Sequence, residues 1–113
     1  MTGVRGQALL WAAQRVSAFV LAACVLVHLA VIIYAVRDGL TATEILGRTR
    51  GNTGWAAFYA LFVVSVAVHA PIGLRTVLSE TFDWRGRGLD VTVLVMALAL
   101  AAWGFRAVYA VFY

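Results

Sequence analysis

Two histidines, His28 and His69, lie inside long apolar stretches and are the residues best placed to do chemistry. His69 belongs to an uncharged run over residues 51–74, which ends just before an arginine. About 20 apolar residues at about 1.5 Å each cross the hydrocarbon of a bilayer, so the run predicts a membrane-spanning helix. An ionisable side chain inside such a helix is costly unless something binds it. A bound ligand or cofactor is therefore the first hypothesis for both rings.

Each histidine belongs to a stripe of side chains on one face of its helix. In the first helix, polar residues recur at spacings of three, seven and four residues: Gln14, Ser17, Cys24 and His28. In the second helix, the stripe around His69 contains Phe62, Ser65, Thr76 and Glu80, with Gly73 close by. An imidazole, a glycine that leaves room beside it and polar groups toward the membrane surface suit a flat buried cofactor with a polar edge.

The composition excludes a water-soluble domain. Of 113 residues, 64% are hydrophobic and 12% are charged, whereas a soluble domain is about one-quarter charged. The mean hydropathy is +0.92. The nine basic residues are all arginines, and they lie at the ends of the apolar runs instead of in one patch. This distribution is typical of anchoring at lipid headgroups, so we expect a lipid bilayer as the environment and no nucleic-acid partner.

The hydropathy pattern predicts an all-α membrane protein with a single domain over residues 1–113. A polar tail is expected over residues 1 to about 8, and the expected transmembrane helices are residues 9–36, 53–78 and 90–112. Three spans place the two termini on opposite sides of the membrane. Arginines are slightly more numerous on the side of the amino terminus, which favours a cytoplasmic amino terminus. Because the first residues are too polar for a cleavable signal, the simplest location is a bacterial inner membrane.

Local signals predict how the helices end and bend. Gly39 is expected to end the first helix, and Thr41 with Glu44 fits a capping box, so a short surface helix is expected in the following loop. Pro71 lacks a backbone donor and clashes with the preceding turn, which predicts a kink beside His69.

Arg15 and Arg75 both mark the inner end of a span and serve as rulers for depth. His28 follows Arg15 by thirteen residues, about 20 Å along a regular helix. His69 precedes Arg75 by six residues, about 9 Å. The two rings then differ in depth by about 10 Å, whereas the two axial ligands of one haem lie at nearly the same depth. Either each histidine pairs with a histidine of another chain, or only one of them is a haem ligand.

Other chemistry fits the residues less well. Zinc takes about four ligands, and the spans offer only two distant histidines and one cysteine. Nucleophilic hydrolysis lacks a carboxylate at the depth of Ser65 and His69. Two alternatives stay open: a small transporter or proton-relay protein with His28, His69 and Arg106 along a pathway, and a haem-free anchor whose histidines only pack. On the residues alone, Arg15 is first an interface arginine that reaches to the surface.

Two segments resemble the membrane anchors of succinate dehydrogenase and fumarate reductase. The segment His69-Ala-Pro-Ile-Gly73-Leu-Arg75, followed by Glu80, resembles the second-helix motif of their cytochrome b subunits. The segment Gln14-Arg15-Val16-Ser17-Ala18 resembles the His-Arg-x-Ser/Thr-Gly segment at the start of the family's first helix. With the three-span layout and the length, the resemblance covers effectively the whole chain.

The resemblance implies a role for each matching residue. His69 matches the axial haem ligand, and Gly73 matches the glycine of the same motif. Arg75 matches the basic residue that closes this motif. Arg15 matches the arginine near the quinone pocket and the haem propionates, and Ser17 matches the serine or threonine of the first-helix segment.

His28 matches a first-helix histidine that binds a second haem in the two-haem members of the family. Three residues depart from the family pattern. Gln14 and Ala18 stand where many members have histidine and glycine, and Trp11 stands where some members have a quinone-contacting serine.

The resemblance implies a haem b-binding anchor subunit of a succinate:quinone oxidoreductase, with one or two haems b and with quinone as substrate. Such a subunit docks a flavoprotein and an iron–sulphur subunit on the cytoplasmic face and passes electrons from succinate to quinone, without oxidising succinate itself. Three spans cannot alone enclose a haem with two histidine ligands. The implied fold is therefore half of a haem-binding helical bundle, completed by a second anchor chain or a second copy.

Overall fold

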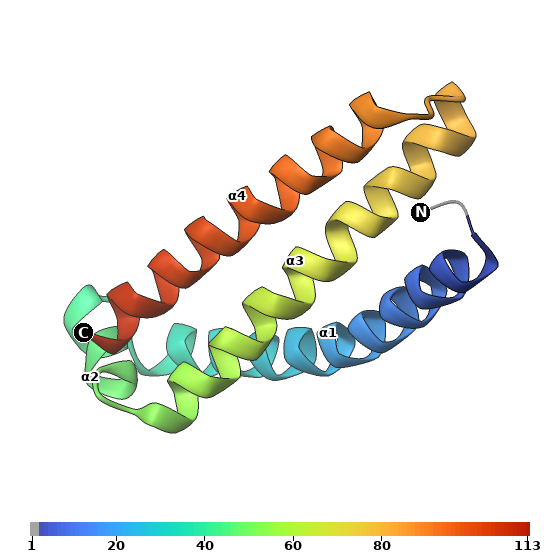
Figure 1. Cartoon of the computed structure of the whole chain (residues 1–113). Helices are drawn as coiled ribbons and strands as arrows, with labels where there is room; N and C mark the ends of the chain where they lie inside the picture. The colour runs from blue at the N-terminus through green and yellow to red at the C-terminus, as the bar shows by residue number, and fades with distance from the viewer. Residues whose placement is uncertain (1–2) are drawn as a thin grey trace.

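The computed structural model describes residues 3–113, and within this range every regular element is a helix. Within these residues, four helices follow one another along the chain and are labelled in Figure 1. They are α1 (Val4–Asp38), α2 (Ala42–Thr49), α3 (Thr53–Phe82) and α4 (Arg87–Phe112). The predicted all-α fold is confirmed. α3 is one continuous helix that contains Pro71.

Three of the helices, α1, α3 and α4, are long and apolar enough to cross a membrane. They contain 35, 30 and 26 residues. At about 1.5 Å per residue, even the shortest exceeds the roughly 30 Å of bilayer hydrocarbon. The predicted spans 9–36, 53–78 and 90–112 lie inside these helices, because helical hydrogen bonding continues into the interfacial regions.

The predicted polar tail over residues 1–8 is wrong where the structure describes it. α1 begins at Val4, and the Gln7 amide donates a hydrogen bond to the Gly3 carbonyl at 2.9 Å. The start of the apolar run shows where the helix enters the hydrocarbon of the bilayer. The helix itself can begin earlier, because polar residues can also be helical.

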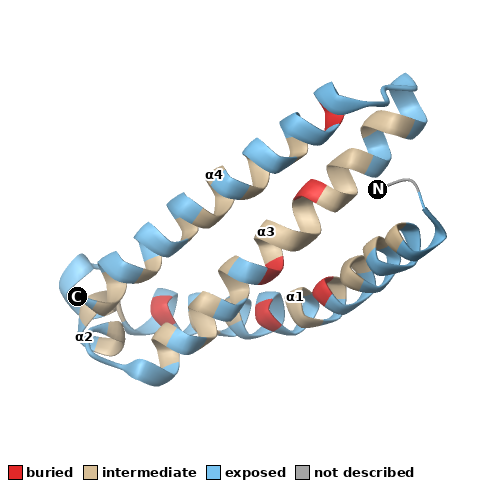
Figure 2. Ribbon diagram, in the orientation of Figure 1, coloured by how far each residue is buried: buried red, intermediate tan, exposed pale blue. Residues whose placement is uncertain are grey.

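α3 is the central helix of the structure. Figure 1 shows it between α1 and α4, and it packs against both of them. Figure 2 shows how few residues are buried. The buried residues are Ser17, Cys24 and Ala35 of α1, Ser65 and Pro71 of α3, and Leu89 of α4. Many large apolar side chains are exposed, as expected for a chain whose surroundings are lipid and other membrane subunits.

α4 approaches α3 closely at Gly104. A Cβ atom at this position would lie 2.5 Å from Cγ1 and 2.9 Å from Cγ2 of Val63. Small residues at such points let membrane helices approach one another. Because Val63 is β-branched and stiff at χ1, it cannot easily turn aside. Glycine at position 104 therefore sets the spacing between the two helices.

The loop after α1 follows the predicted pattern. Gly39 ends α1 with a φ of 148°. The Thr41 hydroxyl accepts a hydrogen bond from the Glu44 amide at 3.2 Å and caps α2, so the predicted surface helix is confirmed. The Arg48 guanidinium donates to the Asp38 carboxylate and to the Gly39 carbonyl, both at 3.0 Å. α2 is thereby fixed against the end of α1.

The connection between α2 and α3 also holds the end of α4. The Thr49 hydroxyl donates to the Val111 carbonyl at 2.8 Å, and the Gly51 amide donates to the Phe112 carbonyl at 2.8 Å. The last carbonyls of a helix have no intrahelical donor. In this structure, two of these carbonyls accept hydrogen bonds from donors about sixty residues earlier in the chain.

Gly104→Ala should lower the thermal stability of the detergent-purified protein, because the new methyl group overlaps Val63. Overpacking of this kind costs about 1–3 kcal/mol, so a fall of several degrees in Tm is expected in circular-dichroism melting curves. Gly47→Ala is the matched control, since nothing lies within 4 Å of a Cβ atom at that position of α2. Equal Tm values for the two variants would contradict the tight contact.

Candidate functional site

The contacts between α1 and α3 fix which residues lie at the same depth. Near the start of α1, the Nε2 atom of Gln14 lies 3.4 Å from the position of a Cβ atom on Gly73. Further along α1, the ring of His28 lies against the rings of Tyr59 and Phe62. The two helices are therefore antiparallel, with the start of α1 level with the end of α3.

His69 lies at the edge of an open cavity of about 440 Å³. The other lining residues all belong to α1, namely Ala18, Leu21, Ala22, Val25 and Leu26. The ring is half-buried, and its Nδ1 atom is buried with no hydrogen-bond partner within residues 3–113. A buried polar atom without a partner is unfavourable. The ring thus faces small and apolar side chains while part of its hydrogen-bonding capacity is unused.

His28 lies in a different and larger cavity, of about 600 Å³. Its ring meets the rings of Tyr59 and Phe62 edge-on, with centroids 5.8 and 5.5 Å away. The Nδ1 atom of His28 is also buried without a partner in the described part of the chain. All four helices contribute to the lining, with Thr49 from α2 and Val108 among the residues from α4.

The two histidines differ in depth, as the arginine rulers predict. Phe62, which contacts the His28 ring, precedes His69 by seven residues in α3. Seven residues of α-helix rise by about 10 Å. The two rings also line separate cavities. A single haem held by both rings does not fit this arrangement.

The α1–α3 interface near His69 is polar toward the end that holds Gln14. Ser17 is buried, and its hydroxyl donates to the Gln14 carbonyl at 3.1 Å. The Oε1 atom of Gln14 is buried and has no partner among the residues described. Gly73 leaves the space beside the Gln14 amide. The interface therefore brings together three predicted site residues, His69, Ser17 and Gly73. It adds Gln14, which the sequence placed on the polar face of the first helix and as a departure from the family pattern, but not among the site residues.

The arginines at this end of the molecule have different neighbours. Arg15 is exposed, and its guanidinium carbon lies 5.2 Å from the centre of the Trp11 ring on the same helix. Arg75 instead forms an ion pair with the Asp90 carboxylate at the start of α4. Arg15 can therefore meet a ligand or a lipid, whereas the charge of Arg75 is compensated within the chain.

Sequence reasoning misses Asp90. α3 and α4 are antiparallel and are joined by a short connection over residues 83–86. Folding the chain about this connection brings residue 90 to within about one helical turn of residue 75. Residues 75 and 90 are thus at similar distances from the connection and carry opposite charges. This is the sequence signal that would have identified the pair.

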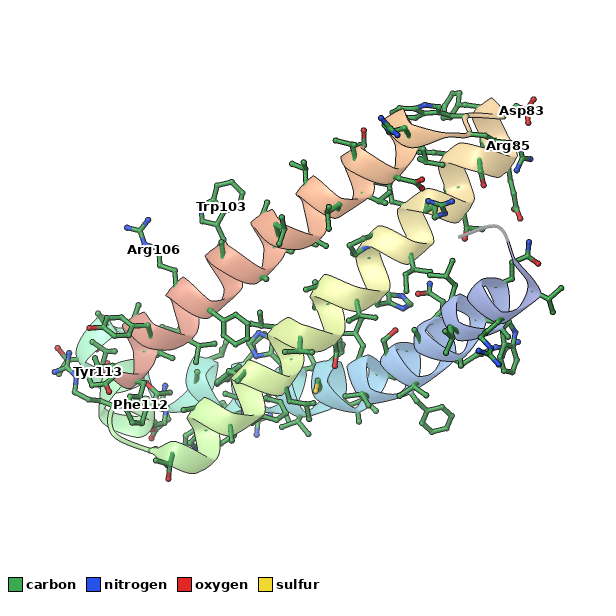
Figure 3. The ribbon with its side chains drawn as sticks, in the orientation of Figure 1. Asp83, Arg85, Trp103, Arg106, Phe112 and Tyr113 are labelled. Atoms are coloured by element: carbon green, nitrogen blue, oxygen red, sulfur yellow. The ribbon has the colours of Figure 1, made fainter. Side chains whose placement is uncertain are left out.

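Arg106 lies apart from both histidines. Figure 3 shows Arg106 projecting from α4 away from α3, and Arg106 lines neither of the two histidine cavities. A pathway shared by His28, His69 and Arg106, which the transporter alternative requires, is not formed by the described residues. Arg106 is exposed, and its interpretation as an interface arginine stays a prediction.

The surroundings of His69 fit a ligand to haem iron. A histidine ring nitrogen is a common axial ligand, and this ring has no hydrogen bond to any described residue that would compete for it. Ala18 and Ala22 of α1 face this cavity with small side chains, which leave room for a planar group. Because the cavity is open, another chain is needed to enclose such a group.

These features define a multi-pass helical membrane protein with histidines at apolar cavities. Over residues 4–108, the chain matches the model of the family described as succinate dehydrogenase/fumarate reductase transmembrane subunit. The match covers most of the chain, which therefore belongs to this family, and the resemblance read from the sequence is confirmed. The chain is thus a membrane subunit of a multi-subunit succinate dehydrogenase/fumarate reductase complex. Comparisons with curated proteins and with solved structures return no significant match.

Gln14→Leu should leave the thermal stability of the isolated subunit unchanged or raise it by about 1 kcal/mol, because the change removes an unpaired buried oxygen. Gln7→Leu, at an exposed position of the same helix, is the control. Thermal unfolding of both variants in detergent provides the measurement. A Tm that falls for Gln14→Leu alone would mean that Oε1 is satisfied by a partner.

Proposed function

We propose that this chain is the haem b-binding anchor subunit of a succinate:quinone oxidoreductase and passes electrons from an iron–sulphur subunit to quinone. The observation that carries the proposal is the state of His69. Its imidazole is half-buried at an apolar cavity, and its Nδ1 atom is unpaired, in a member of a succinate dehydrogenase family. An intramembrane histidine with no protein partner is accounted for by a bound group.

A haem bound at His69 supplies a one-electron redox centre inside the membrane. The task of His69 would be to hold the iron through a ring nitrogen, and its Nδ1 atom has no hydrogen-bond partner within the described chain. Leu21, Val25 and the alanines of α1 keep water away from the ring. Such a low-dielectric environment is one of the levers that set the reduction potential of a haem.

We place the quinone at the end of the molecule where Arg15 lies. The exposed guanidinium of Arg15 can donate hydrogen bonds to a quinone carbonyl or to a haem propionate. Arg75 has a supporting role, because its pairing with Asp90 holds the ends of α3 and α4 together beside this site. Ser17 and Gly73 shape the α1–α3 interface between Arg15 and His69.

The proposed partners follow from the same end of the molecule and from the open cavity. A flavoprotein and an iron–sulphur subunit would dock at the face that carries Arg5, Arg15 and Arg85. The cavity beside His69 would be closed by a second anchor chain or by a second copy, which would also supply the other axial ligand. We assign the complex to a bacterial inner membrane, with the amino terminus of this chain in the cytoplasm.

A second haem at His28 stays a prediction. No other histidine within residues 3–113 lines the His28 cavity, so the other axial ligand would have to come from another chain. The haem-free anchor stays an alternative to the proposal as a whole, and the spectrum of the purified complex separates the two.

His69→Ala should abolish the b-type haem absorbance assigned to this site while the complex still assembles. Dithionite-reduced spectra and a pyridine haemochrome assay of the purified complex provide the measurement. Ser65→Ala is the control, because the Ser65 hydroxyl is buried one turn earlier and is already bonded to the Leu61 carbonyl at 2.9 Å. An unchanged haem signal in the His69 variant would remove His69 as a ligand.

Arg15→Gln should raise the KM for quinone by about tenfold, as expected for the loss of one charge-assisted hydrogen bond. Succinate oxidation with an artificial acceptor should be unaffected, because that chemistry lies in another subunit. Arg37→Gln, at an exposed arginine at the other end of the same helix, should behave as the wild type. Equal quinone kinetics in both variants would place the quinone elsewhere.

A further inference from the structure

Arg106 is a charged side chain that the proposed function does not use. It is exposed on α4 and projects away from α3 (Figure 3). The ion pairs within residues 3–113 involve Arg48, Arg75 and Arg85, and Arg106 belongs to none of them. An arginine inside a membrane-spanning helix is costly unless its charge meets a partner or reaches the membrane surface. For Arg106 the counter-charge therefore has to come from outside the described chain.

The depth of Arg106 in the membrane is set by the length of the apolar part of α4. Asp90 is the last charged residue before Arg106. About 20 residues of helix that begin at Val91 cross the hydrocarbon layer and end near residue 110. The Cα atom of Arg106 then lies about 6 Å inside the hydrocarbon. The long stem of an arginine can carry its guanidinium from such a depth to the lipid headgroups.

Exposed aromatic side chains surround Arg106 on α4. Trp103 precedes it by three residues, Tyr109 follows it by three, and Tyr113 follows it by seven. At about 100° per residue, Tyr113 lies within about 20° of Arg106 around the helix. The rings of Tyr109 and Tyr113 are 4.7 Å apart and inclined at 32°. Trp and Tyr gather at the headgroup level of a bilayer, and a phenol can donate a hydrogen bond. This end of the face is therefore suited to a polar headgroup.

Below Arg106, the same face of α4 is apolar. Val95, Leu98 and Ala102 are exposed at spacings of three and four residues, so they form a stripe that leads up to Arg106. The sequence has no charged residue between Asp90 and Arg106. A positive charge at the headgroup level above an apolar stripe matches a molecule with an anionic head and a hydrocarbon tail.

The position of α4 in the bundle favours lipid as its neighbour over the second anchor chain. That chain would close the His69 cavity, whose other lining residues all belong to α1. α3 lies between α1 and α4, so it separates the outer face of α4 from this cavity (Figure 1). This step rests on the proposed function, because the second chain is part of it. Among lipid groups, the phosphate is the one that a guanidinium binds through two parallel charge-assisted hydrogen bonds.

We propose that Arg106 binds the phosphate of a membrane phospholipid, with one acyl chain of the lipid along the stripe of Val95, Leu98 and Ala102. The hydroxyls of Tyr109 and Tyr113 are available as further donors to the headgroup. The lipid site lies on the outer face of α4 and is separate from both histidine cavities, because Arg106 lines neither of them.

Native mass spectrometry of the purified and delipidated complex, titrated with dioleoylphosphatidylglycerol, tests this site. Arg106→Gln should weaken the binding of one lipid about tenfold, because a charge-assisted hydrogen-bonded pair is lost. Arg106→Lys should lose less, since lysine keeps the charge but not the planar fork of donors. Dioleoylglycerol, which has the same acyl chains and no phosphate, should bind equally to the wild type and to Arg106→Gln.

Arg37→Gln is the matched control for charge. Arg37 is exposed in the last turn of α1, at the same end of the molecule as the end of α4. Its removal lowers the net charge by the same amount, and the lipid affinity should equal that of the wild type. Inorganic phosphate at millimolar concentration should not displace the lipid, because it lacks the acyl chain that lies on the stripe.

Four results would overturn the lipid site. The first is equal lipid affinity in the wild type and Arg106→Gln, and the second is an equal loss in Arg37→Gln, which would show an effect of net charge alone. The third is displacement by inorganic phosphate, since the ligand is then a free anion. The fourth is loss of another subunit from the Arg106→Gln complex, because Arg106 then pairs with a carboxylate of that subunit.

The failure of this inference differs from the failure of the proposed function. Complex that carries haem and reduces quinone, but whose lipid affinity does not depend on Arg106, overturns only the lipid site. Complex that carries no haem and does not reduce quinone overturns the proposed function, whatever the lipid titration shows.

Discussion

The main constraint on this structure is that a polar atom inside the bilayer needs a hydrogen-bond partner, because no water is present to supply one. Side-chain atoms of Gln14, His28 and His69 are buried without partners in the described chain, and all three lie on the α1–α3 pair. In a bilayer, such atoms are not rescued by solvent. The helices themselves satisfy their backbone groups internally, so the unpaired polar atoms are on these side chains. Each of them is an unpaired buried polar atom, which is unfavourable unless a partner is bound.

The rest of the packing is consistent with a subunit that is only part of an assembly. Few residues are buried, and large apolar side chains such as Phe19 and Leu26 are exposed. α3 contacts helices on both sides, whereas α1 and α4 each keep an outer face toward lipid or other subunits. The tight contact at Gly104 and the ion pair of Arg75 with Asp90 tie α4 to α3 at two depths. α4 thus supports α3, and α3 in turn presents His69 to α1.

Features that depend on one helix or on local spacing could be predicted from the sequence. The three spans, the caps at Gly39 and Thr41, and the depth offset of the two histidines all follow from the period and rise of an α-helix. The partner of Arg75 and the division of the interior into two cavities could not be predicted in this way. These features depend on which faces of distant helices meet, and long apolar runs contain little information about that choice.

The hydrogen bonds at the far end of the molecule have a consequence for biosynthesis. Thr49 and Gly51 bond to the carbonyls of Val111 and Phe112, which are synthesised about sixty residues later. During translation, the two donors in the connection between the first two spans therefore have no α4 carbonyl to bond to and are solvated at the membrane surface. The end of α4 can be fixed to this connection only after the third span has been synthesised, whereas α1 and α3 already pack against each other.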